Sequence, residues 1–152
     1  MGLDSYLYKK TYIRTDDFYQ PEVRNEVIVK TGGEIDEKIK PERIRYVVEE
    51  IAYWRKANQI HRWFVENVQN GIDQCQSSYV SRENLEELLN LCQLVAANHS
   101  LADELLPSAS GFFFGGTDYD EWYYNDINST IKYLTEALED EDADEFEYHA
   151  SW

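Results

Sequence analysis

The stretch from Tyr53 to Phe64 concentrates residue types that bind anions and flat rings. Its twelve residues, YWRKANQIHRWF, include three cations, a histidine, two amide side chains and four aromatic rings. Arginine offers a planar fork of donors that fits phosphate or carboxylate, and Trp and Tyr rings offer faces for stacking. We interpret the stretch as one wall of a site for a nucleotide-like anion. Its candidate contacts are Tyr53, Trp54, Arg55, Asn58, His61 and Arg62.

A purely structural interpretation of the same stretch competes with this one. On a helix, Ala57, Ile60 and Phe64 would face the core. Arg62 would pair with Glu66 four residues later on the solvated face. His61 would then be a hydrogen-bonded residue at the edge of the core, and the cations would only keep the surface soluble.

A second segment, residues 108–121, combines small residues, a glycine pair and the start of a helix. Backbone N–H groups at such a helix start can bind an anion, so we add Phe114 and Gly115 to the ligand-binding candidates. The segment is not a P-loop, because no Gly-Lys-Ser/Thr follows the glycines. The acids that follow, Asp118, Asp120 and Glu121, place negative charge where a phosphate would bind.

Catalytic and metal-binding motifs find little support. The chain has no Gly-x-Ser-x-Gly, no HExxH and no His/Cys cluster, so we expect no catalytic residue, no metal and no cofactor. Cys92 falls on an apolar helical stripe and is expected to be a core thiol. A small hydrolase that uses His61 with nearby carboxylates is kept as an alternative.

Several elements must position these residues. Alternation predicts a strand over residues 3–14, and Gly32-Gly33 predicts a hairpin between residues 26–30 and 34–38. Residues 44–53 fit either a helix or a strand, and the helix is favoured. Further helices are expected over 54–70, after the N-cap Ser81, over 101–106 and from Thr117 on, with a short strand at 112–114.

These elements predict an α+β fold, with three to four amphipathic helices packed on a small, mainly antiparallel sheet. We expect residues 1–138 to form a single globular domain. Residues 139–152 are interpreted as an acidic C-terminal tail, although Phe146, Tyr148 and Trp152 could dock onto another surface.

Charge is unevenly distributed along the 152 residues, whose formal net charge is −16. Residues 1–62 hold 12 of the 14 Lys/Arg and have a net charge of +1, whereas residues 63–152 have a net charge of −17. A chain this acidic lacks the cation density that direct nucleic-acid binding needs. No apolar run reaches the roughly 20 residues of a membrane helix. We expect a cytoplasmic protein without membrane contact.

Four segments together resemble a family of small bacteriophage and prophage proteins: MGLDSYL at residues 1–7, KPERI at 40–44, YWRKANQIHRWF at 53–64 and SGFFFG at 110–115. The resemblance covers most of residues 1–138. It implies a phage-encoded accessory protein in the cytoplasm of a bacterial host. It carries over no catalytic residues.

The functional hypothesis combines the anion-binding residue types of the stretch from Tyr53 to Phe64 with the resemblance to phage proteins. We expect an accessory binding protein that counters host defence by binding a nucleotide-like messenger or a host defence protein, with Tyr6 and Lys9 as supporting contacts. The first alternative is an acidic nucleic-acid mimic or another protein-interaction inhibitor of a host enzyme. Homo-oligomerisation is a further possibility.

Overall fold

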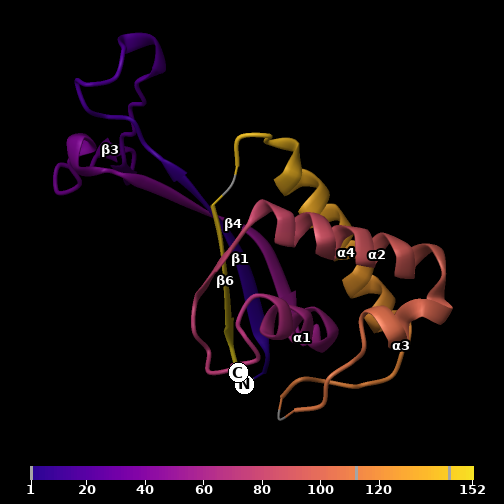
Figure 1. Cartoon of the computed structure of the whole chain (residues 1–152). Coiled ribbons are helices and arrows are strands. Elements are labelled where there is room, and N and C mark those ends of the chain that lie inside the picture. The colour runs from indigo at the N-terminus through magenta and orange to yellow at the C-terminus, as the bar shows by residue number, and fades with distance from the viewer. Residues whose placement is uncertain (1, 112, 144) are drawn as a thin grey trace. The chain divides into compact units, whose positions relative to one another are not determined.

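The computed structural model describes residues 2–111, 113–143 and 145–152 (Figure 1). The chain separates into two compact units. The first, called the main unit, consists of Met1–Lys9 and Glu50–Trp152. The second, called the insert, consists of Lys10–Glu49.

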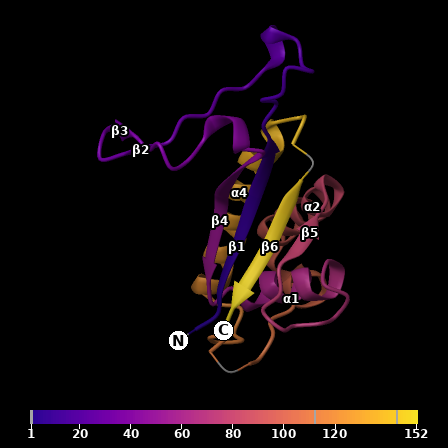
Figure 2. The ribbon, with the colours of Figure 1, turned by 90° about the vertical axis from the view of Figure 1, so that its left-hand side faces the viewer.

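The main unit is built on a four-stranded sheet with the order β4-β1-β6-β5 (Figure 2). The strands are β1 (Asp4–Tyr12), β4 (Tyr46–Arg55), β5 (Ser78–Val80) and β6 (Phe146–Ser151), and β1 and β4 continue into the insert. β6 pairs antiparallel with both β1 and β5. Its register on β1 runs from Asp4 opposite Ser151 to Lys9 opposite Phe146.

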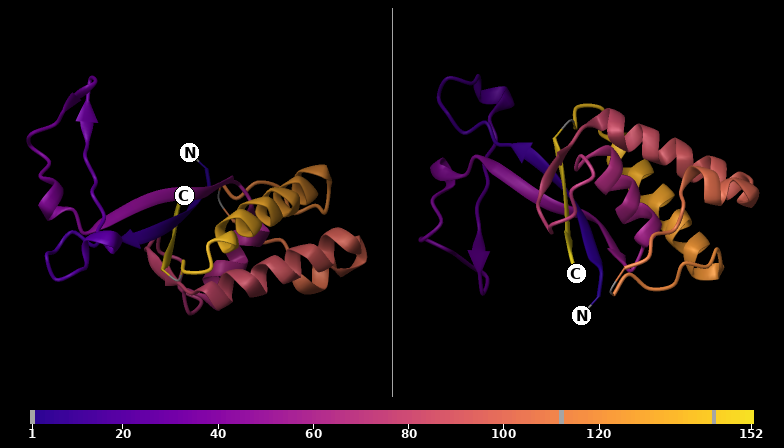
Figure 3. Two further views of the ribbon diagram at one scale, coloured as in Figure 1. Left: turned by 90° about the horizontal axis from the view of Figure 1, so that it is seen from above. Right: turned by 60° about the horizontal axis from the view of Figure 1, so that its bottom comes forward.

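Four α-helices lie on one side of this sheet (Figure 1). They are α1 (Asn58–Asn67), α2 (Arg82–Ala97), α3 (Ala102–Leu105) and α4 (Glu121–Glu139), and α2 packs along α4 (Figure 3). The expected α+β fold with helices on an antiparallel sheet is therefore confirmed. No helix in the described part of the chain has the length and apolar character needed to cross a membrane.

Helix starts follow local capping chemistry. Ser81 caps α2 as expected, and its side chain and that of Asn84 satisfy each other's backbone N–H groups. α4 begins later than Thr117, because Asp120 is its N-cap and accepts a hydrogen bond from the Tyr123 N–H. A carboxylate at this position also complements the positive end of the helix dipole.

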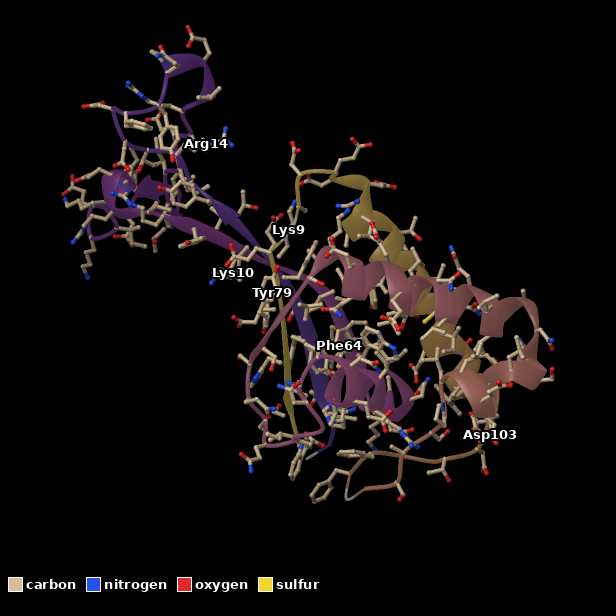
Figure 4. The ribbon with its side chains drawn as sticks, in the orientation of Figure 1. Lys9, Lys10, Arg14, Phe64, Tyr79 and Asp103 are labelled. Atoms are coloured by element: carbon tan, nitrogen blue, oxygen red, sulfur yellow. The ribbon has the colours of Figure 1, made fainter. Side chains whose placement is uncertain are left out.

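The core lies between the sheet and the helices. Leu7 of β1 and Tyr148 of β6 pack in the same apolar cluster as Phe64 of α1, which is labelled in Figure 4. The Phe64 and Tyr148 rings are stacked, with centroids 3.9 Å apart. Cys92 is fully buried, as expected, and its burial raises the pKa of the thiol to about 12.

The helix expected over residues 44–53 is wrong, because Tyr46–Arg55 forms strand β4. Ala52 and Trp54 are buried while Tyr53 and Arg55 are exposed, which is the two-residue period of a strand. The same apolar residues also fit a helical stripe. Pairing with β1 decides for the strand, which suits the β-branched and aromatic residues of this run.

The tail expected over residues 139–152 is also wrong for its second half. β6 is an inner strand of the sheet, and Phe146, Tyr148 and Ala150 point into the core. The alternative that Phe146, Tyr148 and Trp152 dock onto another surface holds for the first two, which are buried in the core, whereas Trp152 is 46% exposed. Acidic residues do not exclude this strand, since Glu147 alternates with the buried side chains and is half-buried between them.

Two other elements are smaller than expected. The Gly32-Gly33 hairpin is present, with both glycines at positive φ, but its strands β2 (Lys30–Thr31) and β3 (Glu34–Ile35) are short. Residues 113–116 form no strand, and Phe112 lies outside the described residues. The short helical turn expected over 101–106 is confirmed as α3.

Candidate ligand-binding pocket

The main unit contains a pocket of about 530 Å³. One wall comes from the end of β4 and the start of α1, and the other comes from α4 and the loop before it. A volume of this size lies within the range of small-molecule sites, which is roughly 300–1,000 Å³.

The turn from β4 into α1 shapes the first wall. Lys56 adopts a left-handed conformation with φ 58°, which is uncommon for a residue with a side chain. Its N–H donates to the Leu3 carbonyl at 2.7 Å, and its carbonyl accepts from the Asn58 N–H at 2.9 Å. Gly115 approaches so closely that an added Cβ would lie 3.2 Å from the Lys56 Cβ. The tight turn brings the Arg55 and Lys56 residues to the pocket wall.

Asn58 connects the two walls. Its buried side-chain amide donates to the carbonyls of Phe114 and Gly116, at 2.9 and 2.8 Å. Its Oδ1 accepts from the Ala109 N–H at 3.0 Å. One side chain at the start of α1 therefore fixes both ends of the loop segment that closes the pocket.

The second wall is a face of α4 beside the one that packs in the core. It carries Trp122, Asn125, Asp126, Ser129 and Tyr133, a spacing of i, i+3, i+4, i+7 and i+11. Trp122 is 79% exposed and makes no ring contact with another described residue. Deeper in, Tyr133 meets the buried Trp54 edge to face, with centroids 5.7 Å apart. The pocket thus offers an unused aromatic face.

The two walls carry opposite charge. Arg55 and Lys56 line the first, and Asp118, Asp120 and Asp126 line the second. Arg55 also lies 3.7 Å from Asp4, whereas Lys56 makes no ion pair with a described residue. A ligand with an anionic group at one end and hydrogen-bond donors at the other would match this distribution.

Asp126 has a raised pKa, at about 6. Partial burial is the main cause, and the nearby Asp120 raises the pKa further, while a hydrogen bond with Gln59 opposes both. Near neutral pH this carboxyl can therefore exchange a proton and can accept hydrogen bonds from a ligand.

Replacement of Asp126 by Asn is expected to change how stability depends on pH. In the folded state the carboxyl binds a proton more tightly than at its ordinary pKa of 3.8, so raising the pH from about 4 to about 6 favours unfolding. Since the group is partly exposed, we expect wild type to lose about 1 kcal/mol over this interval relative to Asp126→Asn.

Urea unfolding at several pH values measures this difference. Asp118→Asn, at an exposed position of the same pocket, is the matched control and should follow wild type. If the free energies of unfolding of wild type and Asp126→Asn change in parallel with pH, Asp126 is not the source of the pH dependence.

The structure brings five of the eight sequence candidates to the pocket. Tyr53, Trp54, Arg55, Asn58 and Gly115 line it, although the first three come from β4 rather than from a helix.

The other three candidates, His61, Arg62 and Phe114, do not line the pocket. The expected (i, i+4) pair of Arg62 is confirmed, since its Nε donates to Glu66 at 2.9 Å. The supporting candidate Lys9 donates to Asp140 at 2.8 Å, outside the pocket (Figure 4).

His61 lies at the buried end of a chain of polar contacts. Its ring is 1% exposed, with Nδ1 2.8 Å from the Tyr148 hydroxyl and Nε2 3.0 Å from Asp73. The other Asp73 oxygen accepts from the Trp152 indole N–H at 3.0 Å. Both ring nitrogens have partners, which matches the structural interpretation of His61. The packing of Phe114 edge to face on the His61 ring adds to this burial.

The sequence interpretation missed the α4 wall. Its polar and aromatic residues form a second stripe beside the apolar stripe of α4. The helical spacing of this second stripe is the sequence signal by which the wall could have been found. Lys56 and Gln59 were also missed, because only the turn between β4 and α1 brings them to the pocket.

Among residues 2–111, 113–143 and 145–152, no group of three or more His, Cys, Asp or Glu side chains is placed to hold a metal ion. Comparisons of the chain with protein-family models, curated proteins and solved structures find no match.

Proposed function

We propose that this protein binds a nucleotide-like small molecule in the pocket between β4, α1 and α4. The observation that carries the proposal is the separation of charge across one pocket of about 530 Å³, with Arg55 and Lys56 on one wall and three carboxylates on the other. A nucleotide has the matching asymmetry, since its phosphate is an anion and its base presents N–H donors.

The phosphate would bind at the start of α1. This helix has no side-chain cap and no acidic residue in its first turn, so the positive end of its dipole is not neutralised locally. Lys56 lies just before it, and makes no ion pair with a described residue. The start of α4 is less suited to bind a phosphate, because the Asp120 carboxylate already caps that helix.

The base would lie against α4. Trp122 offers an exposed ring, and stacking of a base on an aromatic side chain contributes about 1–3 kcal/mol. Asp126 accepts hydrogen bonds, and Asn125 and Ser129 can donate or accept. Acceptors dominate this wall, which favours a base with adjacent N–H donors such as guanine.

The biological role that fits is capture of a nucleotide messenger by a phage accessory protein. Support for this part comes from the resemblance of four segments to small phage and prophage proteins. Binding alone would serve this role, because sequestration of a messenger lowers its free concentration.

Replacement of Trp122 or Lys56 by Ala is expected to weaken nucleotide binding by about 10- to 100-fold, through the lost stacking or the lost charge. Calorimetric titration with GMP, guanosine, ribose 5-phosphate and cyclic di-GMP measures the effect. Trp122→Ala should weaken the binding of both guanosine and GMP. Lys56→Ala should weaken the binding of GMP and leave the affinity for guanosine unchanged.

Matched controls exist for both variants. Phe18→Ala removes an aromatic ring that is 90% exposed in the insert, and Lys132→Ala removes an exposed cation on α4 outside the pocket. Neither should change affinity. Absence of binding by all four compounds to folded wild-type protein, or equal losses in the controls, would contradict the proposal.

A further inference from the structure

The insert exposes most of its large apolar side chains. In Lys10–Glu49 only Ile13 is buried among the residues that the structure describes. Eight large apolar side chains of the insert are between 41% and 90% exposed: Tyr12, Phe18, Val23, Ile28, Ile35, Ile39, Tyr46 and Val48. They amount to half of the exposed large hydrophobic residues of the described chain, in about a quarter of its length.

Polar contacts hold the insert in shape instead of a core. Arg14 and Asn25 exchange two hydrogen bonds, at 2.9 and 3.0 Å, and the Ile13 N–H donates to the Arg45 carbonyl at 2.8 Å. The bond from the Arg14 N–H to the Asn25 side chain is exposed, and a bond of this kind contributes only about 1 kcal/mol net. A unit with one buried apolar residue gains little from hydrophobic burial alone, so covering its apolar side chains would stabilise it considerably.

The insert and the main unit differ strongly in net charge. The insert holds 8 basic and 9 acidic residues, a net charge of −1, whereas the main unit holds 6 and 21, a net charge of −15. Two copies of the main unit therefore repel each other, and two copies of the insert do not. Interspersed charges of both signs also allow one insert to pair with another, and the absence of net positive charge argues against nucleic acid.

The exposed apolar area of the insert is of the order that a dimer interface uses. Fully covering one large aromatic side chain buries about 150–250 Å². With three aromatic and five aliphatic side chains between 41% and 90% exposed, the insert exposes apolar area on the order of an interface of standard size, which buries about 800 Å² per partner.

We propose that the insert is a homodimerisation surface, and that its occupant is the insert of a second copy of this chain. The contact is isologous, with the same apolar side chains on both partners. Because the two acidic main units repel each other, salt screens the repulsion and strengthens the dimer. An interface held by ion pairs would weaken with salt instead.

Sedimentation velocity of the full chain over a range of concentrations tests the proposal, at about 0.05 M and about 0.5 M salt. We expect a monomer–dimer equilibrium that is tighter at the higher salt. Phe18→Asp and Ile35→Glu should each raise the dissociation constant by at least about 30-fold, as at an interface hot spot. Both side chains are exposed, and circular dichroism checks that the variants fold.

Leu94→Glu is the matched control, because Leu94 is an exposed apolar residue of α2 in the main unit. It should leave the dissociation constant unchanged. A monomer at every concentration and both salts would overturn the proposal, and so would an effect of Leu94→Glu equal to that of Ile35→Glu. A dimer that weakens with salt would overturn it as well.

Discussion

Truncation of the chain after Glu139 is expected to abolish cooperative folding of the main unit. The deletion removes β6, an inner strand that pairs with β1 and β5, and leaves their facing edges unpaired. It also removes Phe146 and Tyr148, which are fully buried. Loss of one buried large aromatic side chain costs about 3–5 kcal/mol, and a domain of this size is stable by only about 5–15 kcal/mol.

Circular dichroism and urea unfolding measure the outcome. A shorter truncation that removes only Ser151 and Trp152 is the control, because both residues are exposed. It loses the Trp152 hydrogen bond to Asp73 and should cost no more than about 1.5 kcal/mol. A cooperative unfolding transition in the chain that ends at Glu139 would show that the sheet does not depend on β6.

Asn58→Ala has the second largest expected effect, on stability and binding together. The substitution leaves the Ala109 N–H and the carbonyls of Phe114 and Gly116 without their partner. Each buried group left unpaired costs about 1–3 kcal/mol, and two of these contacts are only partly buried, so we expect a loss of about 2–4 kcal/mol. The loop that they hold is one side of the pocket, so GMP binding should fall more than the lost stability explains.

Unfolding and calorimetric titration of the same preparation separate the two effects. Asn90→Ala is the matched control, since Asn90 is an exposed residue of α2 outside the pocket, and it should change neither quantity by more than a few tenths of a kcal/mol. If Asn58→Ala is as stable as Asn90→Ala, the loop does not depend on this side chain. If stability falls while GMP affinity is unchanged, the loop does not shape the site.

Asn58 also shows how the pocket is coupled to the fold. The left-handed turn at Lys56 lies in the junction between β4 and α1, and the approach of Gly115 and the three hydrogen bonds of Asn58 join this junction to the loop before α4. A rigid junction of this kind preorganises a site, because ordering a loop on binding would reduce affinity. The candidate ligand contacts Arg55 and Lys56 belong to the same junction.

The sequence by itself determined the features that depend on neighbouring residues. The N-cap Ser81 and the stripe with Cys92 predicted α2, and Gly32-Gly33 predicted the hairpin turn. The antiparallel α+β class followed from the alternation over β1 and the helical stripes. The uneven distribution of charge and the cluster of cations and aromatic rings around Arg55 could also be recognised, since residue types and short spacings suffice for them.

Only the tertiary structure decided the features that depend on distant pairing. Residues 44–53 carry a pattern that fits a helix or a strand, and pairing with β1 makes most of them part of β4. The sequence of residues 139–152 predicts an acidic tail, but β1 and β5 pair with Phe146–Ser151 on both sides. Burial of His61 depends on Tyr148, 87 residues away, and the α4 wall becomes a pocket only opposite the β4–α1 junction. Hydrogen bonding between strands far apart in sequence leaves no local signal, so these parts could not be inferred from the chain alone.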